Sequence, residues 1–395
     1  MAGGAAEVFA VFLRLGLTSF GGPIAHVVLF RREFVERRAW VTDRQFGQLL
    51  TASQLLPGPG SSKLGFSIGL LRAGWAGALA AFIAFTLPSA LLLFAFAALL
   101  PRLDGASGQN LLHGLKLVAL AVVAQGLVGM VRSLCPDLAR RALAVLAAAI
   151  VLGSAAGAAA QLYAIGLGAL GGAILCRAVR PDFSGELALA YGPATGALLL
   201  AACAVLLFGL PWAAHSGARD AVRYADAFFH AGALVFGGGH VVLPLLQEAV
   251  VAPGWIGRAD FLAGYGAAQA VPGPMFALAA YLGARLPGPD GGAFGALVAL
   301  CAIFLPGFLL MAGILPFWRA LAGHPVAARA MAGVSAAAVG LLGAALYDPV
   351  WIAAVRGPGD VVIAGAAALA LWRWQLSPLL VVLWCVAASL FGGLG

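Results

Sequence analysis

Long apolar segments recur along this chain, and they fix the solvent in which it can fold. A helix needs about 20 apolar residues to cross the roughly 30 Å of bilayer hydrocarbon. Only 10% of the residues are charged, against about 25% in soluble proteins, so most of the surface must face lipid. The sequence therefore predicts a polytopic membrane protein embedded in the lipid bilayer. The clearest predicted spans are 74–100, 111–131, 187–210, 291–317, 326–347, 352–371 and 376–394.

Two regions, 5–72 and 220–286, depart from this pattern. Their apolar runs are too short to cross alone and are interrupted by Gly and Pro, which is typical of broken or re-entrant helices. The block 142–176 is long enough for two short crossings, with a break between Gly153 and Gly157. At about 20 residues a crossing, we expect about 9–13 crossings, depending on whether the broken regions cross fully.

The two broken regions also resemble each other. Phe20-Gly21-Gly22-Pro23 matches Phe236-Gly237-Gly238-Gly239, and the segment from Gln54 to Pro59 matches the segment from Gln269 to Pro274. Because such matches follow in the same order at a nearly constant offset, we interpret them as an internal repeat. The predicted division is a first transport repeat at 1–186, a connecting span and loop at 187–218, and a second repeat at 219–395.

Charge indicates how the two repeats are oriented. Segment 31–44 carries five arginines, whereas its counterpart 247–260 carries only Arg258. Because basic loops face the cytoplasm, the first segment is expected inside and the second outside. The prediction is an all-α fold with two inverted repeats whose broken helices meet near the middle of the bilayer. The alternative is a parallel duplication with uneven charges.

The Pro-Gly-Pro motif of each repeat is the main candidate binding site. Proline removes a backbone donor and disfavours helix before it, so each motif interrupts an apolar helix. The half-helix that follows has free N–H groups and a positive dipole end, which together attract anions. The alternative is that both motifs are only hairpin tips. The predicted substrate-binding residues near the breaks are Gln54, Pro57, Gly58, Pro59, Ser61, Ser62, Lys63, Gln269, Pro272, Gly273 and Pro274.

A basic residue precedes each Phe-Gly-Gly motif by six positions, Arg14 in one half and His230 in the other. A charge in an apolar run is costly unless it faces a cavity or a partner. Arg14 is therefore included among the substrate-binding residues, with snorkelling or pairing to Glu7 as the alternatives, and His230 is either packed or an anion or proton group. Lys116 lies either at a cavity or snorkels toward the end carrying His113. The secondary candidates are Gly21, Gly22, His26, Lys116, His230, Gly237, Gly238 and His240.

Several classes of function lack support in the sequence. The net charge of +8 comes from short basic clusters between spans, which favours membrane orientation over nucleic-acid binding. The five cysteines are scattered without a CxxC, so neither disulfides nor structural zinc are expected. No nucleotide or metalloprotease motif occurs. We therefore predict no enzyme activity, no metal and no cofactor.

The repeated motifs resemble the chromate ion transporter family in its long, two-repeat form. The resemblance rests on Phe-Gly-Gly-Pro with His26, Trp40, Gln54 with Pro-Gly-Pro, Ser61-Ser62, the stretch from Gly69 to Gly77, and Leu87-Pro88, with their second-half counterparts. Two positions depart from the family pattern: a polar residue is expected where Gly60 stands, and an amide where Lys63 stands.

The resemblance implies a secondary transporter of the bacterial inner membrane that exports chromate. Its substrate partner would be chromate, with sulfate as the similar competitor, and transport would use alternating access driven by the proton gradient or the membrane potential. The alternatives are a sulfate-type oxyanion carrier and an anion channel. The oligomeric state is left open, with a homodimer as one option.

Overall fold

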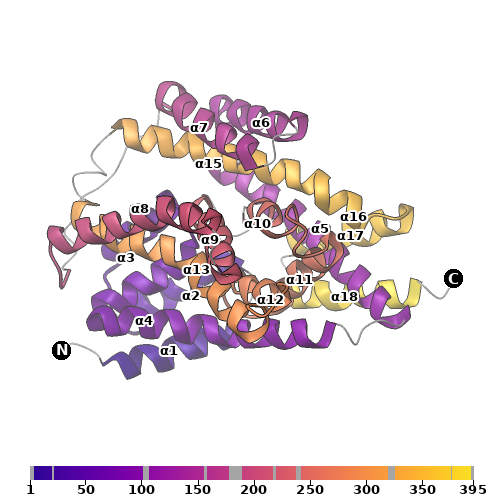
Figure 1. Cartoon of the computed structure of the whole chain (residues 1–395), viewed down its shortest axis with the longest axis horizontal. Coiled ribbons are helices and arrows are strands. Elements are labelled where there is room, and N and C mark those ends of the chain that lie inside the picture. The colour runs from indigo at the N-terminus through magenta and orange to yellow at the C-terminus, as the bar shows by residue number, and fades with distance from the viewer. Residues whose placement is uncertain are drawn as a thin grey trace.

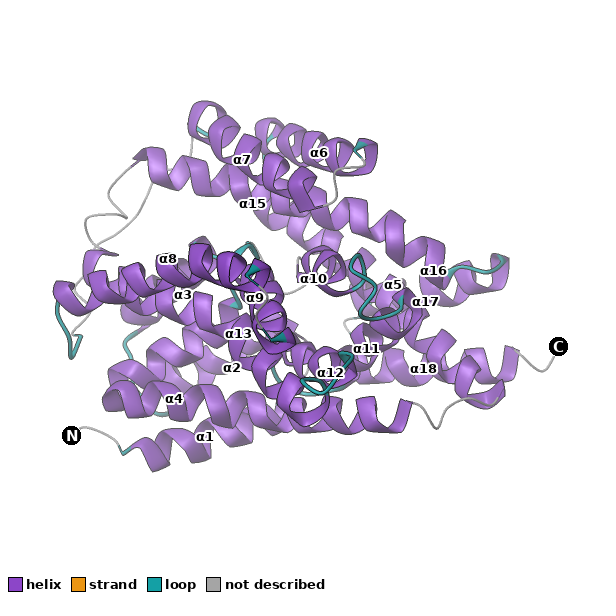
Figure 2. Cartoon of the chain, viewed as in Figure 1, coloured by secondary structure: helices purple, strands orange, loops and turns teal. Residues whose placement is uncertain are grey.

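The computed structural model describes residues 4–19, 22–100, 106–154, 158–177, 189–216, 219–236, 242–318, 325–374 and 376–392. Within these ranges the chain is helical, with no strand (Figures 1 and 2), which confirms the predicted all-α class. In chain order the helices are α1 (Ala5–Thr18), α2 (Gly22–Arg31), the π-helix η1 (Arg32–Arg37), α3 (Asp43–Leu55), α4 (Gly60–Leu99), α5 (Ala106–Leu134), α6 (Leu138–Gly153), α7 (Ala158–Leu175), α8 (Pro193–His215), α9 (Asp220–Ala233), α10 (Val242–Val250), α11 (Arg258–Ala270), the 3₁₀ turn η4 (Met275–Ala277), α12 (Leu278–Arg285), α13 (Gly292–Ile314), the 3₁₀ turn η5 (Leu315–Phe317), α15 (Pro325–Ala345), the π-helix η6 (Leu346–Trp351), α16 (Ile352–Ala354), α17 (Pro358–Arg373) and α18 (Pro378–Gly392).

Five helices among the described residues are long and apolar enough to cross a membrane, so the chain is a multi-pass membrane protein. Two predicted spans are shorter than expected. Segment 352–371 is divided between α16 and the 16-residue α17, because Gly357-Pro358 delays the start of α17. Segment 376–394 yields the 15 residues of α18. The five long segments are Gly60–Leu99, Gly108–Leu134, Pro193–His215, Gly292–Phe317 and Pro325–Ala354.

Helix α4 consists of two antiparallel limbs. Ala73 and Gly74 leave helical dihedral angles, with φ at +61° for Gly74. In a straight helix Gly69 and Gly77 would lie about 12 Å apart along the axis, yet a Cβ added at Gly69 would collide with the carbonyl oxygen of Gly77. The chain therefore folds back at 73–74. Limb 60–72 precedes the reversal, and limb 75–99 corresponds to the first predicted span.

Helix α3 and limb 60–72 form a re-entrant hairpin, which we call the first hairpin. Each arm of 13 residues is about 20 Å long, too short to cross the hydrocarbon. The open ends of both arms lie together, because Glu7 pairs with Arg72 at 3.0 Å and with Arg38 at 3.7 Å, and both guanidinium groups stack on Trp40. The connecting tip is Pro57-Gly58-Pro59, so the predicted helix break is confirmed.

The second half contains the matching hairpin, built from α11, η4 and α12. Arg285 pairs with Asp260 at 3.1 Å, and the Tyr281 hydroxyl donates to the Asp260 carbonyl at 2.9 Å. These contacts hold the open ends of α11 and α12 together. The tip of this second hairpin is Pro272-Gly273-Pro274, where the second predicted break is also confirmed.

The open ends of the two hairpins lie at opposite ends of two long helices. Limb 75–99 leaves the first hairpin and spans about 35 Å, and near its far end Phe96 stacks on Tyr281 of the second hairpin with ring centroids 5.6 Å apart. Helix α13 starts beyond the second hairpin and runs the other way. Near its far end the Ala312 carbonyl accepts from the Tyr191 hydroxyl, whose ring packs on Trp75 beside the first hairpin.

The outer helices of each half pack against a helix of the other half. Helix α5 contacts α17 and α18, while α15 contacts α6 and α7. Glycine permits these close approaches: a Cβ added at Gly172 would meet the backbone of Gly333, and one at Gly114 would meet the backbone of Val386. Figure 1 shows α6, α7 and α15 as a layer along one edge of the molecule, with α1 and α4 along the opposite edge.

Candidate functional site

The two hairpin tips contact the ends of helices in opposite halves through a reciprocal pair of hydrogen bonds. The Gly58 N–H donates to the Val235 carbonyl at 2.7 Å, and the Gly273 N–H donates to the Ser19 carbonyl at 2.9 Å. Ser19 follows α1 and Val235 follows α9, so each tip reaches the first helix of the other repeat. Gly58 and Gly273 have φ of +104° and +102°, a conformation that glycine adopts without strain.

Each tip also packs on the long helix of the other half. A Cβ added at Gly58 would lie 2.8 Å from Gly307 Cα in α13. A Cβ added at Gly273 would lie 3.0 Å from the Ser89 hydroxyl in limb 75–99. The tips are therefore held within the protein, where irregular backbone at membrane depth is tolerated.

Behind the first tip, the start of limb 60–72 presents helix N–H groups inside the protein. Its N-cap is Pro59, which provides no side-chain acceptor for them. Ser61 and Ser62 are both buried. The arrangement joins uncapped N–H groups to a positive dipole end, as an anion site requires.

The two serine hydroxyls differ in what they can still donate. His26 Nε2 lies 3.3 Å from the Ser19 carbonyl and Nδ1 lies 3.2 Å from Ser61 Oγ. A carbonyl only accepts, so Nε2 carries the proton, and in the neutral ring Nδ1 accepts from the Ser61 hydroxyl. Ser62 Oγ, in contrast, is buried without a hydrogen-bond partner. Ser62 is therefore the hydroxyl donor left for a ligand.

Lys63 is fully buried and its Nζ points back into the tip. Nζ donates to the Leu56 carbonyl and, at 2.9 Å, to the Pro57 carbonyl. These bonds satisfy acceptors that the helix break leaves open. In its protonated form Nζ has three N–H groups, so a protonated Lys63 would keep one for a ligand. No carboxylate among the described residues forms an ion pair with Lys63.

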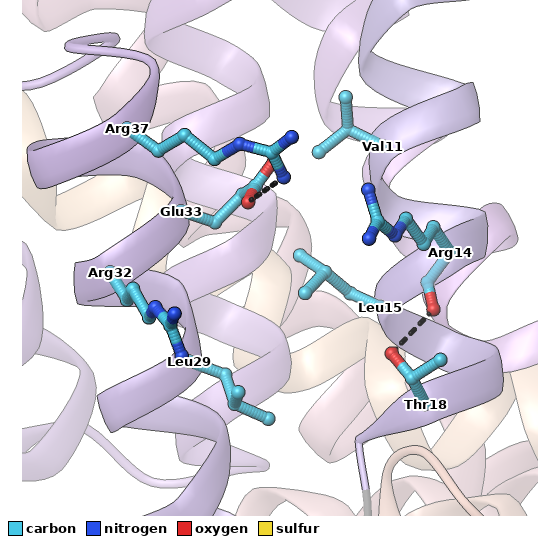
Figure 3. Close-up of a pocket in the computed structure, with 8 residues that line it drawn as sticks. All are labelled: Val11, Arg14, Leu15, Thr18, Leu29, Arg32, Glu33 and Arg37. Carbon is cyan, nitrogen blue, oxygen red and sulfur yellow. Dashed lines mark hydrogen bonds and ion pairs between the residues drawn. The ribbon is translucent and has the colours of Figure 1, made fainter.

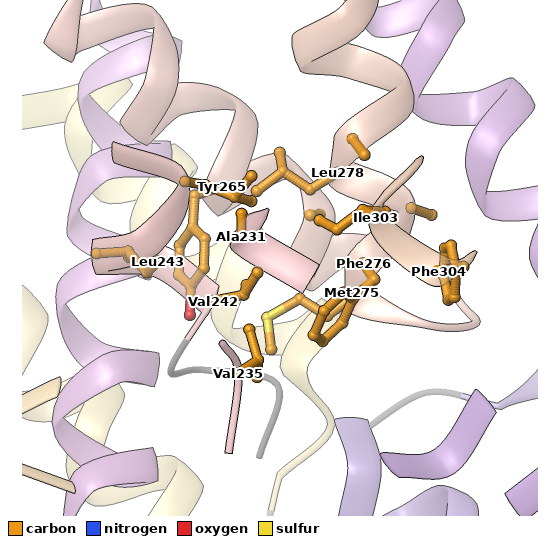
Figure 4. Packing of buried hydrophobic residues seen from close by; sticks show 14 of the residues in the cluster. Ala231, Val235, Val242, Leu243, Tyr265, Met275, Phe276, Leu278, Ile303 and Phe304 are labelled. Atoms are coloured by element: carbon orange, nitrogen blue, oxygen red, sulfur yellow. The ribbon is translucent and has the colours of Figure 1, made fainter. Parts of the chain in front are cut away.

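The second tip is apolar where the first is polar. Met275 and Phe276 occupy the positions after it, packed with Ile303 and Phe304 of α13 (Figure 4). Gln269 Nε2 lies 3.2 Å from the Met275 sulfur. Its counterpart Gln54 is exposed. The two glutamines, which are equivalent in sequence, thus have different surroundings.

The secondary candidates fall in three places. His230 places both ring nitrogens on protein acceptors, with Nδ1 2.9 Å from Asp226 and Nε2 3.0 Å from the Leu207 carbonyl. Lys116 is half-buried in α5, one turn after His113, which pairs with Asp360 at 2.8 Å. Gly22 is the first residue of α2. The candidates Gly21, Gly237, Gly238 and His240 lie outside the described residues.

Arg14 lies in a surface pocket between α1 and η1 rather than between the tips (Figure 3). The pocket has a volume of 310 Å³, within the range of about 300–1,000 Å³ typical of small-molecule sites. Its polar lining includes Arg32, Glu33 and Arg37, and the last α1 residue in the lining is Thr18, whose hydroxyl donates to the Arg14 carbonyl at 2.8 Å. The expected alternative pairing of Arg14 with Glu7 is wrong, because Glu7 pairs with Arg72 and Arg38.

Glu33 holds two of the surrounding arginines. It pairs with Arg37 at 3.2 Å and accepts a hydrogen bond from Arg38. Partial burial raises the pKa of Glu33, but the hydrogen bonds from Arg38 and Arg37 outweigh it and hold this pKa below its usual value. Glu33 is therefore ionised at neutral pH.

Sequence reasoning missed some of the polar groups near the tips. The Ser19 and Thr86 hydroxyls are buried without hydrogen-bond partners, and the Ser19 carbonyl joins the second tip to His26. Arg32 and Arg37 were interpreted only as signals of orientation. Among these residues only Ser19 had a signal in the sequence, its position directly before Phe-Gly-Gly. The pocket had no such signal, because it depends on the packing of η1 beside α1.

These features define a multi-pass membrane protein with two re-entrant breaks, each packed against the other half of the chain, and broken helices of this kind are common in membrane transporters. A family model described as "Chromate transporter" matches residues 6–176 and 222–390. The chain therefore belongs to the chromate transporter family. No solved structure gives a significant match.

Curated relatives agree with this assignment. The chain is 27% identical to the "Chromate transport protein" of Pseudomonas aeruginosa, over 98% of this chain and 92% of that protein. It is 28% identical to the "Probable chromate transport protein" of Synechococcus elongatus, over 85% and 82% of the two chains. The "Chromate transport protein" of Cupriavidus metallidurans is 27% identical over 85% and 80%.

Proposed function

We propose that this protein is a secondary transporter that exports chromate, a divalent tetrahedral oxyanion, with sulfate as a competitor. The observation that carries the proposal is the polar start of limb 60–72, where the unpartnered Ser62 hydroxyl and the Lys63 amine nitrogen lie beside uncapped helix N–H groups. The family and the printed names of the relatives support chromate as the substrate.

In this proposal Lys63 has a structural role and a binding role at once. Two of its N–H groups hold the tip, and the third, with its positive charge, faces the anion. A buried charge without a counter-ion is costly, so the dianion would supply the missing charge. A single ammonium with neutral donors would bind the anion weakly enough to release it.

We further propose that the two repeats have inverted topology. Support comes from the two hairpins, whose open ends lie at opposite ends of limb 75–99, and from the reciprocal bonds of Gly58 and Gly273. A two-fold axis in the membrane plane would relate the two hairpins to each other, and it would also relate the Gly58 hydrogen bond to the Gly273 hydrogen bond. Because each tip contacts both halves, small shifts of one half against the other would open the tips alternately to the two sides, driven by the proton gradient or the membrane potential.

The test is uptake of labelled chromate into everted vesicles, with and without a proton gradient, in the presence of competing sulfate. Chromate uptake is expected to need Lys63, so Lys63→Met should reduce uptake at least about tenfold, which corresponds to about 1.4 kcal/mol. The amount of the variant protein in the membrane should stay normal. Ser67→Ala is the matched control, since its hydroxyl donates within the helix to the Lys63 carbonyl at 2.8 Å.

Three outcomes would contradict this proposal in different ways. Normal uptake by Lys63→Met would remove the first tip from the mechanism. Preference for sulfate over chromate would indicate a sulfate-type carrier. Currents carried by the anion without proton coupling or saturation would indicate a channel.

A further inference from the structure

We propose that the pocket between α1 and η1 is a capture site for the divalent oxyanion, distinct from the hairpin tips and lying on the face of the protein that carries the open end of the first hairpin. This inference rests on the proposed transport function and adds a second binding site to it. It predicts unequal apparent affinity from the two sides of the membrane.

The charge of the pocket comes from three arginines and one glutamate, Arg14, Arg32, Arg37 and Glu33, a sum of +2. Neither Arg14 nor Arg32 has an ion pair or side-chain hydrogen bond within the described part of the chain. Figure 3 shows the Arg14 side chain extending from α1 across from Glu33 and Arg37. Two guanidinium groups are thus left for an anion, and such groups bind tetrahedral oxyanions through paired N–H donors.

The position of the pocket links it to the first tip. Thr18 lines the pocket, and the next residue, Ser19, accepts hydrogen bonds from both Gly273 and His26. His26 in turn contacts Ser61 at the start of limb 60–72. The pocket lining therefore ends at Thr18, one residue before Ser19. Ser19 contacts the second tip directly and, through His26, the start of limb 60–72.

The positions of the second repeat that align with Arg14, Arg32 and Arg37 hold no arginine. The counterpart of Arg14 is His230, whose ring nitrogens contact Asp226 and the Leu207 carbonyl. Arg32 aligns with Gln247 or Glu248, and Arg37 with Ala252 or Pro253. The two arginines at the open end of the second hairpin are each paired: Arg258 with Asp348 at 3.2 Å and Arg285 with Asp260 at 3.1 Å.

A one-sided capture site changes kinetics and leaves the equilibrium untouched. From the arginine face it raises local anion concentration and lowers KM, and the effect weakens with salt because the groups are exposed. Since transport is reversible, kcat/KM without a gradient must change equally in both directions. For transport that starts at the opposite face, loss of the site therefore lowers kcat and leaves KM unchanged, because the anion is released more slowly through the pocket.

The experiment measures initial rates of labelled sulfate and chromate transport at zero gradient, from each face, in everted and right-side-out vesicles. The variant is Arg32→Gln, and the matched control is Arg31→Gln. Arg31 is the adjacent residue with the same charge, but it is outside the pocket and paired with Glu36 and Asp43. Arg32→Gln is expected to raise KM from the arginine face about tenfold, which corresponds to about 1.4 kcal/mol.

The expected pattern for Arg32→Gln also includes unchanged KM from the opposite face and a weaker dependence of KM on salt. Arg31→Gln should leave KM within about twofold on both faces. Equal effects of the two variants would overturn the capture site, because they would indicate only a general surface potential. A KM increase on both faces would place Arg32 at the shared site. If the wild type transports neither anion, the proposed function fails and the capture site fails with it.

Discussion

Alanine at position 58 tests whether the first tip must pass close to α13. Gly58 has φ of +104° and a Cβ there would lie 2.8 Å from Gly307 Cα. The left-handed conformation costs a non-glycine residue about 1–2 kcal/mol, and overpacking costs about 1–3 kcal/mol. The sum predicts that Gly58→Ala loses about 2–5 kcal/mol of unfolding free energy.

Two further variants separate these contributions. Gly254 has φ of +77° and no atom within 4 Å of an added Cβ, so Gly254→Ala should show the backbone cost alone, about 1–2 kcal/mol. Gly307→Ala meets only contacts of 3.1 to 3.4 Å, from Pro59, Gly58 and Lys63. The loss of unfolding free energy for Gly307→Ala should therefore lie near the lower end of the overpacking range, about 1 kcal/mol.

The assay is equilibrium unfolding of the purified proteins by SDS in mixed micelles, followed by tryptophan fluorescence, with chromate uptake measured in parallel. Gly58→Ala should lose both stability and uptake, whereas Gly254→Ala should retain uptake. The reasoning is refuted if Gly58→Ala is no less stable than Gly254→Ala, since the contact with α13 would then contribute nothing.

Three other predictions follow from polar contacts. Ser62→Ala removes a buried hydroxyl without a partner, so stability should hold or rise while the KM for chromate rises several-fold; a fall in stability without a KM change would refute its role as a donor. Tyr191→Phe loses the 2.6 Å bond to the Ala312 carbonyl and should lower stability by about 0.5–1.5 kcal/mol in the same SDS assay, with KM unchanged. Glu33→Gln raises the pocket charge from +2 to +3, so KM from the arginine face should fall although two ion pairs are lost; a higher KM would contradict the capture site. Because the pKa of Glu33 is depressed, the stability from these pairs should be complete above the usual Glu range near about 4.3 and disappear only as pH falls below it.

Much of the fold was predictable because proline and glycine act locally. Pro57-Gly58-Pro59 and Pro272-Gly273-Pro274 break their helices as backbone chemistry requires, and both breaks appear where predicted. The reversal inside α4 was not predicted, since Ala73 and Gly74 lie between two apolar runs without a proline. There the fold-back depends on the close contact of Gly69 with Gly77.

The candidate site was predictable only in part. The sequence indicates that Ser61, Ser62 and Lys63 start a half-helix, but it cannot show that His26 accepts a hydrogen bond from Ser61 or that Lys63 donates to the tip carbonyls. Arg14 was expected beside the tips and lies instead in the pocket with Arg32. Both outcomes depend on contacts between residues distant in sequence, which local patterns do not encode.

The exchange of outer helices between the halves has a consequence for how the chain matures. Helix α5 packs on α17 and α18, and these leave the ribosome long after α5 because they come much later in the chain. Until then the face of α5 around Gly114 lacks its final partner. Neither half is therefore a self-sufficient folding unit, and halves produced as separate polypeptides should become protease-resistant only when they are made together.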